Sequence, residues 1–289
     1  MRRPTVIAAA ALAIAAAGPL GAAGAATGDE ARADRGAAWL ARNVAGAPGG
    51  QQADAIVAMR AAGRSRASVK GRLRALSRVA PAYATTAGGA GKVVMAAVAA
   101  GADPRRLGAV DYVQRINARY ASGRYGASAF DQALSMLALR SAGRRVPAAA
   151  VRATLAARGR GGWSFDMSRR GRDAVDHTAI VIEALRAAGL PRRHAALRAA
   201  ASWMLAQRNR SGGLASAGAG GATDANSTAM AIRALRALGR RPPAPTLRAL
   251  RSLQERGGAF RFTRADPGSR LLATPDAVLA LAGEVLPPR

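Results

Sequence analysis

Apolar residues recur three and four positions apart along most of the chain, and this spacing is typical of helices with an apolar face. Six of the apolar runs end in small residues followed by a glycine. Glycine ends helices because it lacks a Cβ and therefore adopts the left-handed conformation without strain. We expect six helices that end in the same way, at Gly63, Gly101, Gly143, Gly189, Gly239 and Gly283.

A second helical stretch lies before each of these glycine-terminated helices. It carries apolar residues at the same spacing with arginines between them, as in Leu197, Ala201 and Met204. The glycines follow one another at intervals of 38, 42, 46, 50 and 44 residues, so the repeating unit is a helical hairpin. We expect the first helices of the hairpins at 34–44, 65–79, 105–119, 147–158, 193–207 and 245–256.

The two kinds of helix differ in polarity. Glycine-terminated segments such as 178–188 and 228–238 are apolar or alanine on most faces, whereas their partners are amphipathic and rich in arginine. Helices that are apolar all round are usually buried. The sequence therefore predicts an all-α fold, an α/α toroid (α6/α6 barrel) of six helical hairpins with the apolar helices inside. An open α-solenoid is the alternative, but it needs end repeats with a polar face, and neither end unit is much more polar than the others.

The loops before the last three apolar helices share a motif, which pairs a Gly-Gly sequence with the polar start of the next helix. The pairs are Gly-Gly-Trp-Ser-Phe-Asp (161–166) with Asp-Ala-Val-Asp-His-Thr-Ala (173–179), Gly-Gly-Leu (212–214) with Asp-Ala-Asn-Ser-Thr-Ala (224–229), and Gly-Gly-Ala-Phe (257–260) with Ala-Thr-Pro-Asp-Ala (273–277). These motifs resemble the repeats of the squalene cyclase, terpene cyclase and protein-prenyltransferase superfamily, which is built on a six-hairpin toroid. The resemblance is good over 150–283 and rests on repeat period and glycine stops over 30–145.

The resemblance implies a candidate site. In the cyclases, the middle carboxyl of an Asp-x-Asp-Asp run protonates an alkene or epoxide, and aromatic faces stabilise the carbocations that follow. Aligned on Thr178, the middle acid is Asp176, the candidate general acid, with His177 beside it. Its two partner positions hold Ala174 and His177 in place of Asp, so the acid motif is incomplete. The residues expected to line the ligand cavity are Trp163, Phe165, Asp224, Asn226, Phe260 and Phe262.

Each of these residues also has a structural interpretation. Asp176 and Asp224 lie at or just before helix starts, where a carboxylate accepts backbone N–H groups and meets the positive end of the helix dipole. The aromatic residues would fill the gaps between outer and inner helices. The sequence leaves both interpretations open.

The chain is strongly basic. Its 289 residues include 44 Lys+Arg against 16 Asp+Glu, for a net charge of +28. The positive residues are nearly all arginine and recur on almost every helical segment, whereas nucleic-acid-binding proteins gather them on one face or in one tail, so we expect no nucleic-acid partner. The sequence has no cysteine, which excludes disulfides, thiolate zinc sites and the zinc chemistry of the prenyltransferases. We expect neither a metal nor a cofactor.

Residues 1–26 have the features of a secretory signal peptide. Arg2 and Arg3 give a positive start, 6–17 are apolar, and 23–26 (Ala-Gly-Ala-Ala) form a small-residue cleavage site. The apolar run is too short and too rich in alanine for a membrane span. We predict a secreted, extracytoplasmic protein that is not an integral membrane protein, in which residues 27–289 form the toroid domain.

Three functions fit these observations. The first is binding of an apolar or isoprenoid-type ligand in the central cavity without transforming it. The second is an active terpene cyclase, similar to squalene cyclase, with Asp176 as general acid. The third is a cell-envelope scaffold whose arginines bind an anionic polymer or lipid. We favour binding over catalysis because the acid motif is incomplete, and because the cyclases enclose their substrate between two toroids while this chain has room for one.

Overall fold

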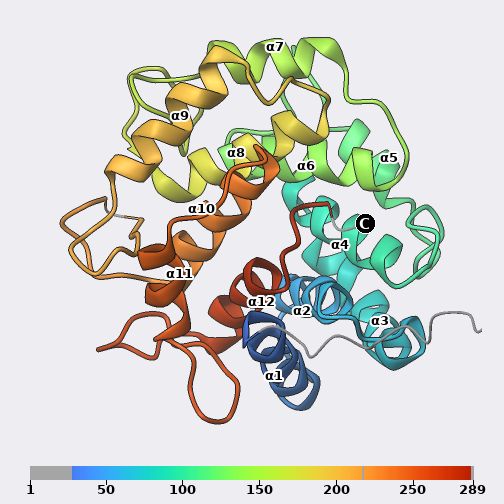
Figure 1. The fold of residues 1–289 in the computed structure, drawn as a ribbon. Coiled ribbons are helices and arrows are strands. Elements are labelled where there is room, and N and C mark those ends of the chain that lie inside the picture. Colours follow the sequence, from blue (N-terminus) through green and yellow to red (C-terminus); the bar gives the residue numbers. More distant parts are fainter. Residues whose placement is uncertain (1–27, 217, 288–289) are drawn as a thin grey trace, which may run out of the picture.

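The computed structural model describes residues 28–216 and 218–287, and these residues are mostly α-helical (Figure 1), which confirms the predicted all-α class. The odd-numbered helices are α1 (Gly28–Asn43), α3 (Arg66–Tyr83), α5 (Tyr112–Asn117), α7 (Ala148–Ala156), α9 (Ala195–Ala206) and α11 (Ala244–Arg251). The even-numbered helices are α2 (Gly49–Ala61), α4 (Ala87–Ala99), α6 (Ala129–Ser141), α8 (Val175–Ala187), α10 (Ala225–Ala237) and α12 (Arg270–Leu281). Two short antiparallel strands, β1 (Trp163–Ser164) and β2 (Asp173–Ala174), pair Trp163 with Ala174 and Ser164 with Asp173.

The even-numbered helices carry most of the buried residues. Helix α2 contacts α4, the contacts continue in order through α6, α8 and α10 to α12, and α12 contacts α2 in turn. Figure 1 shows these helices around the segment that follows α12. Their first turns lie at one end, which we call the amino end. At the start of α4, Gly88 N–H donates to Asp131 Oδ1 at the start of α6, and Asn226 Nδ2 of α10 donates to the Leu272 carbonyl of α12.

All six predicted glycine stops are confirmed. Each of the six glycines has a positive φ, between 70° and 98°. After each glycine, the next N–H donates to the carbonyl five residues earlier, as Leu190 does to Leu185. These hydrogen bonds form a Schellman motif, which satisfies carbonyl groups that the helix end would otherwise leave without a donor. Each repeating unit identified in the sequence therefore ends with the same backbone geometry at the end of a helix.

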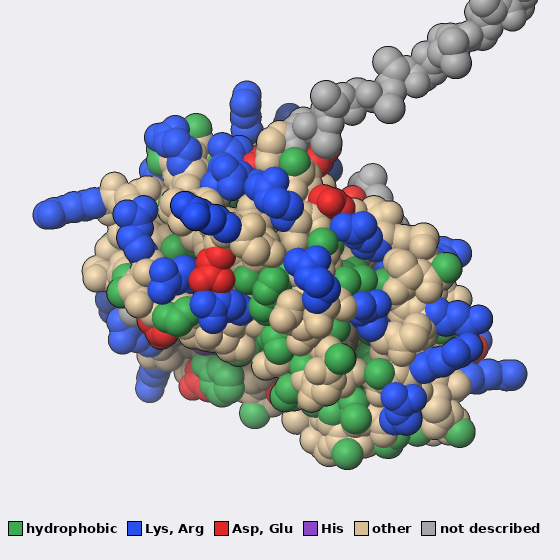
Figure 2. Space-filling model, turned by 90° about the horizontal axis from the view of Figure 1, so that it is seen from below, with side chains coloured by type: hydrophobic (Ala, Val, Ile, Leu, Met, Phe, Trp, Pro, Cys, Tyr) green, Lys and Arg blue, Asp and Glu red, His purple; other side chains and the backbone are tan. Residues whose placement is uncertain are grey.

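An arginine three residues before the glycine joins neighbouring even-numbered helices. In three repeats, the guanidinium donates to a backbone carbonyl at the end of the next even-numbered helix: Arg60 to Ala99, Arg186 to Ala237, and Arg236 to Ala280. Many other arginines lie at the surface, and Figure 2 shows Lys and Arg over much of the face drawn, with few Asp or Glu. Part of the positive charge therefore fixes the contacts between repeats.

The expected first helices of the hairpins all overlap observed helices, and the third differs most. We expected 105–119, whereas α5 begins at Tyr112 and ends at Asn117. Gly108 and Ala109 both have positive φ values, 60° and 62°, and hold the chain in turns. The helix begins only after Asp111, whose Oδ1 accepts the Gln114 N–H as an N-cap. Turn geometry therefore overrides the apolar spacing at this place.

The predicted signal peptide at residues 1–26 lies outside the described residues, so the signal peptide and export stay predictions. Among the residues that the structure describes, no helix combines the length and the apolar character that crossing a membrane requires.

Candidate functional site

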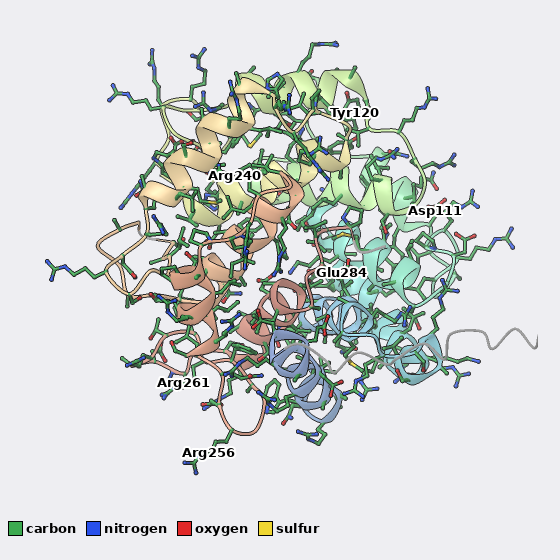
Figure 3. All side chains as sticks on the ribbon, viewed as in Figure 1. Asp111, Tyr120, Arg240, Arg256, Arg261 and Glu284 are labelled. Carbon is green, nitrogen blue, oxygen red and sulfur yellow. The ribbon has the colours of Figure 1, made fainter. Side chains whose placement is uncertain are left out.

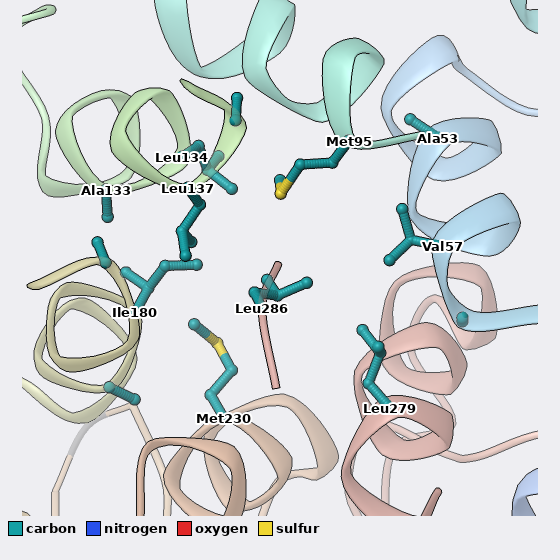
Figure 4. Packing of buried hydrophobic residues seen from close by; sticks show 14 of the residues in the cluster. Ala53, Val57, Met95, Ala133, Leu134, Leu137, Ile180, Met230, Leu279 and Leu286 are labelled. Carbon is teal, nitrogen blue, oxygen red and sulfur yellow. The ribbon is translucent and has the colours of Figure 1, made fainter. Parts of the chain in front are cut away.

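A small cavity lies at the centre of the even-numbered helices (Figure 4). Its volume is about 80 Å³. All six even-numbered helices contribute to its lining, as does the segment after α12. The lining residues are Asp54, Val57, Lys92, Met95, Phe130, Leu134, Ile180, Met230, Arg233, Pro275, Asp276, Leu279 and Leu286.

The cavity wall is built from equivalent positions of the repeats. Nine residues before the glycine stop, five successive helices carry Asp54, Lys92, Leu134, Ile180 and Met230. Three residues later, on the same helix face, they carry Val57, Met95, Leu137, Glu183 and Arg233. The repeat thus places two levels of side chains around the centre, and both levels combine apolar with charged residues.

The charged residues at the centre form ion pairs. Lys92 Nζ lies 2.6 Å from Asp54 Oδ2. Arg233 Nε and Nη2 donate to the two carboxylate oxygens of Glu183, each at 3.2 Å, and Arg233 also pairs with Asp276. The side chains of Arg233 and Glu183 are only 1% and 0% exposed. Charges tolerate such burial only when they are paired and hydrogen-bonded, so the two clusters depend on staying complete.

Burial and pairing act in opposite directions on these groups. Burial raises the pKa of Asp54 and of Glu183, and the neighbouring cations offset part of this increase. Burial would lower the pKa of Lys92, but the attraction and the hydrogen bond of Asp54, together with the attraction of Tyr83 and Asp276, outweigh burial and the pKa is raised. Among the described residues around the cavity, three carboxylates face two cations, and each cation has a partner. The wall therefore offers no unpaired positive charge to an anionic ligand.

The segment after α12 occupies the middle of the cavity. Leu286 is 8% exposed and lies among apolar side chains of the even-numbered helices (Figure 4). Its backbone N–H donates to Glu183 Oε1 at 3.0 Å. Figure 3 places Glu284 of the same segment in the middle of the molecule, whereas Arg256 extends from its edge. The contact joins a residue near the end of the chain to a helix 103 residues away.

Asp176 lies in the first turn of α8, at the amino end. Burial raises its pKa to about 6, the carboxylates of Asp224 and Asp276 add to the increase, and a hydrogen bond with Ser227 of α10 offsets part of it. Its Oδ1 is buried without a hydrogen-bond partner. A carboxyl group with a raised pKa keeps its proton to a higher pH, which is a property of proton donors.

His177 faces the other side of α8. Its ring centroid lies 5.3 Å from that of Phe130 on α6 and 5.6 Å from that of Phe165. Burial lowers the pKa of His177, so its ring is neutral at neutral pH. Neighbouring residues of a helix point about 100° apart, and here His177 faces α6 while Asp176 faces α10. The structure brings His177 together with Phe165 and separates it from the Asp176 carboxyl.

The four predicted aromatic residues divide into two pairs. Trp163 and Phe260 are fully buried, and the Trp163 indole N–H donates to a backbone carbonyl of α7 at 2.7 Å. Phe165 and Phe262 are 59% and 37% exposed, and their carbonyl oxygens accept the N–H groups of the first residues of α6 and α10. Trp163 belongs to β1 and the other three to loops, and none of the four lines the central cavity.

Asp224 and Asn226 have separate roles at the start of α10. Asp224 is the N-cap, and its Oδ1 accepts the Ser227 N–H at 2.7 Å. Asn226 Nδ2 donates to Asp276 Oδ2 at 2.9 Å and to the Leu272 carbonyl. Asn226 is therefore hydrogen-bonded to the ion-pair network of the cavity through Asp276, whereas Asp224 caps the start of its own helix.

A threonine in each motif joins the loop to the buried helix. The hydroxyl oxygen accepts a backbone N–H from the loop, at 3.0 to 3.1 Å, in the pairs Thr178 with Trp163, Thr228 with Leu214, and Thr274 with Phe260. A Cβ at Gly162 would overlap the Thr178 hydroxyl, so the second glycine of that motif is needed for the close approach. The resemblance to the cyclase repeats thus falls on residues that hold the repeat together.

Reasoning from the sequence did not single out the charged residues of the cavity. The sequence feature that could have identified them is their separation by one repeat. Asp54 and Lys92 are 38 residues apart, and Glu183 and Arg233 are 50 apart, which are the intervals between the corresponding glycines. An acid and a base at equivalent positions of adjacent repeats predict an ion pair between neighbouring helices. Both pairs are present in the structure.

A scan against protein-family models found no match, and a search of the curated proteins found none either. Within the described residues, no group of three or more His, Cys, Asp or Glu side chains is arranged to hold a metal ion. The geometry of the central cavity and of the amino end therefore indicates what the protein does.

Proposed function

We propose that the chain is an α/α toroid of six helical hairpins with repeats similar to those of the squalene cyclase and prenyltransferase superfamily. Two observations support this architecture. The contacts of the even-numbered helices return from α12 to α2, and all of these helices end in the same glycine motif. The threonine hydrogen bonds of the last three repeats support their equivalence.

We propose that this protein is exported and binds an apolar or isoprenoid-type ligand in its central cavity without transforming it. The observation that carries the proposal is the composition of the wall. Leu134, Ile180 and Met230 provide apolar contacts, and every charge in the lining is already paired. An uncharged chain gains contact with the apolar side chains and leaves the ion pairs undisturbed.

Isothermal titration of the purified protein with farnesol, a 15-carbon isoprenoid alcohol, tests this proposal. Met230→Trp places an indole in the cavity and should weaken binding by about tenfold or more, equivalent to at least about 1.4 kcal/mol. Leu272→Trp is the matched control, because it adds the same ring at a position that is 48% exposed and outside the cavity. The proposal fails if the wild-type protein binds no farnesol, or if the two variants bind it equally well.

A second candidate is an active terpene cyclase with Asp176 as general acid. The raised pKa of this buried carboxyl favours it, whereas the incomplete acid motif does not. The protein would be incubated with squalene and with shorter polyprenyl diphosphates, and products would be compared with those of Asp176→Asn. Products that disappear in the variant support catalysis, and the absence of products from both proteins contradicts the cyclase candidate.

The third candidate is a cell-envelope scaffold that binds anionic polymer or lipid. The spread of arginine over the surface in Figure 2 favours it. Binding through exposed arginines weakens as salt screens the charges. Retention of the protein on phosphatidylglycerol vesicles should therefore be lost between low and high salt, and retention that is independent of salt contradicts this candidate.

A further inference from the structure

Residues 283–287 turn back from the end of α12 into the centre of the molecule. Gly283, with a φ of 83°, makes the turn. Leu286 follows three residues later and supplies the apolar side chain at the middle of Figure 4. Of all the lining residues, Leu286 alone belongs to no helix. One side chain of an irregular segment therefore takes the most central position in the proposed binding site.

The space beside Leu286 is too small for the proposed ligand. The cavity measures about 80 Å³, whereas an engineered apolar cavity of about 150 Å³ holds a single benzene. Binding of a longer chain therefore requires a part of the wall to move. The even-numbered helices are each held by two neighbours, so displacing one of them would disturb several interfaces.

Segment 283–287 is held far less strongly. Three of its backbone N–H groups donate hydrogen bonds in the described structure. Those of Gly283 and Glu284 go to the Ala280 and Leu279 carbonyls of the helix end, and only that of Leu286, to Glu183, holds the rest of the segment. Leu286 is the one buried side chain of the segment. Segments with few buried contacts and few hydrogen bonds open at the lowest free energy. This segment is therefore the part of the wall that moves most readily.

The hydrogen bond at Glu183 limits what can replace the segment. If Leu286 leaves, Glu183 Oε1 loses one of its two donors and keeps only Arg233 Nε, and the loss of a hydrogen bond to a buried carboxylate is costly. A ligand hydroxyl can supply that donor. A diphosphate would instead bring negative charge beside Glu183 and Asp276, where the Arg233 guanidinium is already shared between the two.

We propose that Leu286 occupies the place of the ligand's branched apolar end, and that a neutral branched-chain alcohol displaces segment 283–287 and donates its hydroxyl to Glu183 in place of the Leu286 N–H. The proposal rests on the binding function proposed above. The branched leucine side chain and its N–H together resemble a branched alkyl group that ends beside a donor. The segment is then a competitor within the chain, which lowers the apparent affinity by the fraction of molecules in which it is seated.

The absence of cysteine allows a direct test with single thiols. Leu286→Cys puts the thiol on the segment, and Leu279→Cys, the matched control, puts it on the α12 wall of the same cavity. The rate of modification by a maleimide is measured with and without farnesol, after circular dichroism has confirmed folding. Farnesol should raise the rate at 286 by about tenfold or more, because it moves the segment into solvent, and should lower the rate at 279, because it covers that position.

Three other outcomes count against the proposal in different ways. If farnesol slows modification at both positions, the cavity binds the alcohol with the segment in place, so the binding function stands and displacement is wrong. If it changes neither rate, both the binding function and displacement fail. If farnesyl diphosphate acts as farnesol does, the role of the hydroxyl and of the paired charges is wrong.

Hydrogen exchange of the wild-type protein gives the same answer without a substitution. The Leu286 N–H, which donates to Glu183, should exchange about tenfold faster or more when farnesol is bound. The N–H of Leu190, which follows another glycine stop directly and donates to the Leu185 carbonyl, is the internal control and should keep its rate. Slower exchange at Leu286 in the presence of farnesol would overturn the proposal.

Discussion

Replacing Asp176 with asparagine tests the account of the amino end, because it removes the ionisable group and keeps the shape of the side chain. Burial raises the pKa of Asp176 from 3.8 to about 6. Between these two values, the folded protein binds more protons than the unfolded chain, so stability falls as the pH rises. Below pH 3.8 the group is protonated in both states and has no effect. Above about pH 6 its full cost is present.

The size of the effect follows from the shift. One pKa unit corresponds to about 1.4 kcal/mol, so the shift of about two units destabilises the folded state by about 3 kcal/mol at pH 8. Asparagine does not ionise. Asp176→Asn should therefore be more stable than wild type by up to about 3 kcal/mol at pH 8, and nearly equal to it at pH 4.

Urea unfolding followed by circular dichroism at pH 4 and at pH 8 measures this difference. Asp103→Asn is a control of opposite sign. Backbone hydrogen bonding with Arg105 lowers the pKa of Asp103, so its carboxylate stabilises the fold above the unfolded pKa, and the variant should lose stability at pH 8. The predicted cost of the buried carboxylate is wrong if Asp176→Asn changes stability equally at both pH values, or if it is the less stable protein at pH 8.

Three further predictions concern stability and are checked by urea unfolding. Arg233→Met should cost about 3–5 kcal/mol because it leaves Glu183 buried without its cation, and Arg233→Met combined with Glu183→Leu should recover part of the loss; full additivity would contradict the pairing. Thr228→Val should cost about 1–3 kcal/mol because the Leu214 N–H loses its acceptor, and an unchanged midpoint would contradict the role of the motif threonine. Gly189→Ala should cost about 1–2 kcal/mol through its φ of 98° alone, since no atom lies within 4 Å of the added Cβ; a neutral effect would show that the helix end adapts.

The sequence predicted those features of the fold that local chemistry determines. The glycine stops were predictable because the left-handed conformation is a property of glycine itself, and the helical hairpins because apolar spacing reports which face is buried. Helix α5 was predicted too long. Its start depends on the turn at Gly108 and Ala109, and a positive φ at an alanine has no sequence signal.

The candidate site was predicted less well, because it depends on which residues meet across the fold. The sequence motif places Asp176 at a helix start but does not predict its surroundings, because the raised pKa comes from burial and from the carboxylates of Asp224 and Asp276 in other repeats. The charged residues of the cavity were not predicted, because a single charged residue does not alter the apolar character of a helix. Their separation by one repeat interval is nevertheless visible in the sequence. The position of Leu286 could not be predicted from the sequence. Its partner Glu183 lies 103 residues away, so the contact depends on how the intervening chain folds.

The most direct test of ligand binding in the central cavity uses the methionine methyl groups. The chain has seven methionines, of which Met95 and Met230 line the cavity, whereas Met136 and Met204 are buried elsewhere. With ¹³C-methyl-labelled methionine, nuclear Overhauser contacts to bound farnesol would be measured by NMR. Binding in the central cavity predicts contacts to Met95 and Met230 and none to Met136 or Met204. Saturating farnesol without contacts to Met95 and Met230 would contradict the central claim.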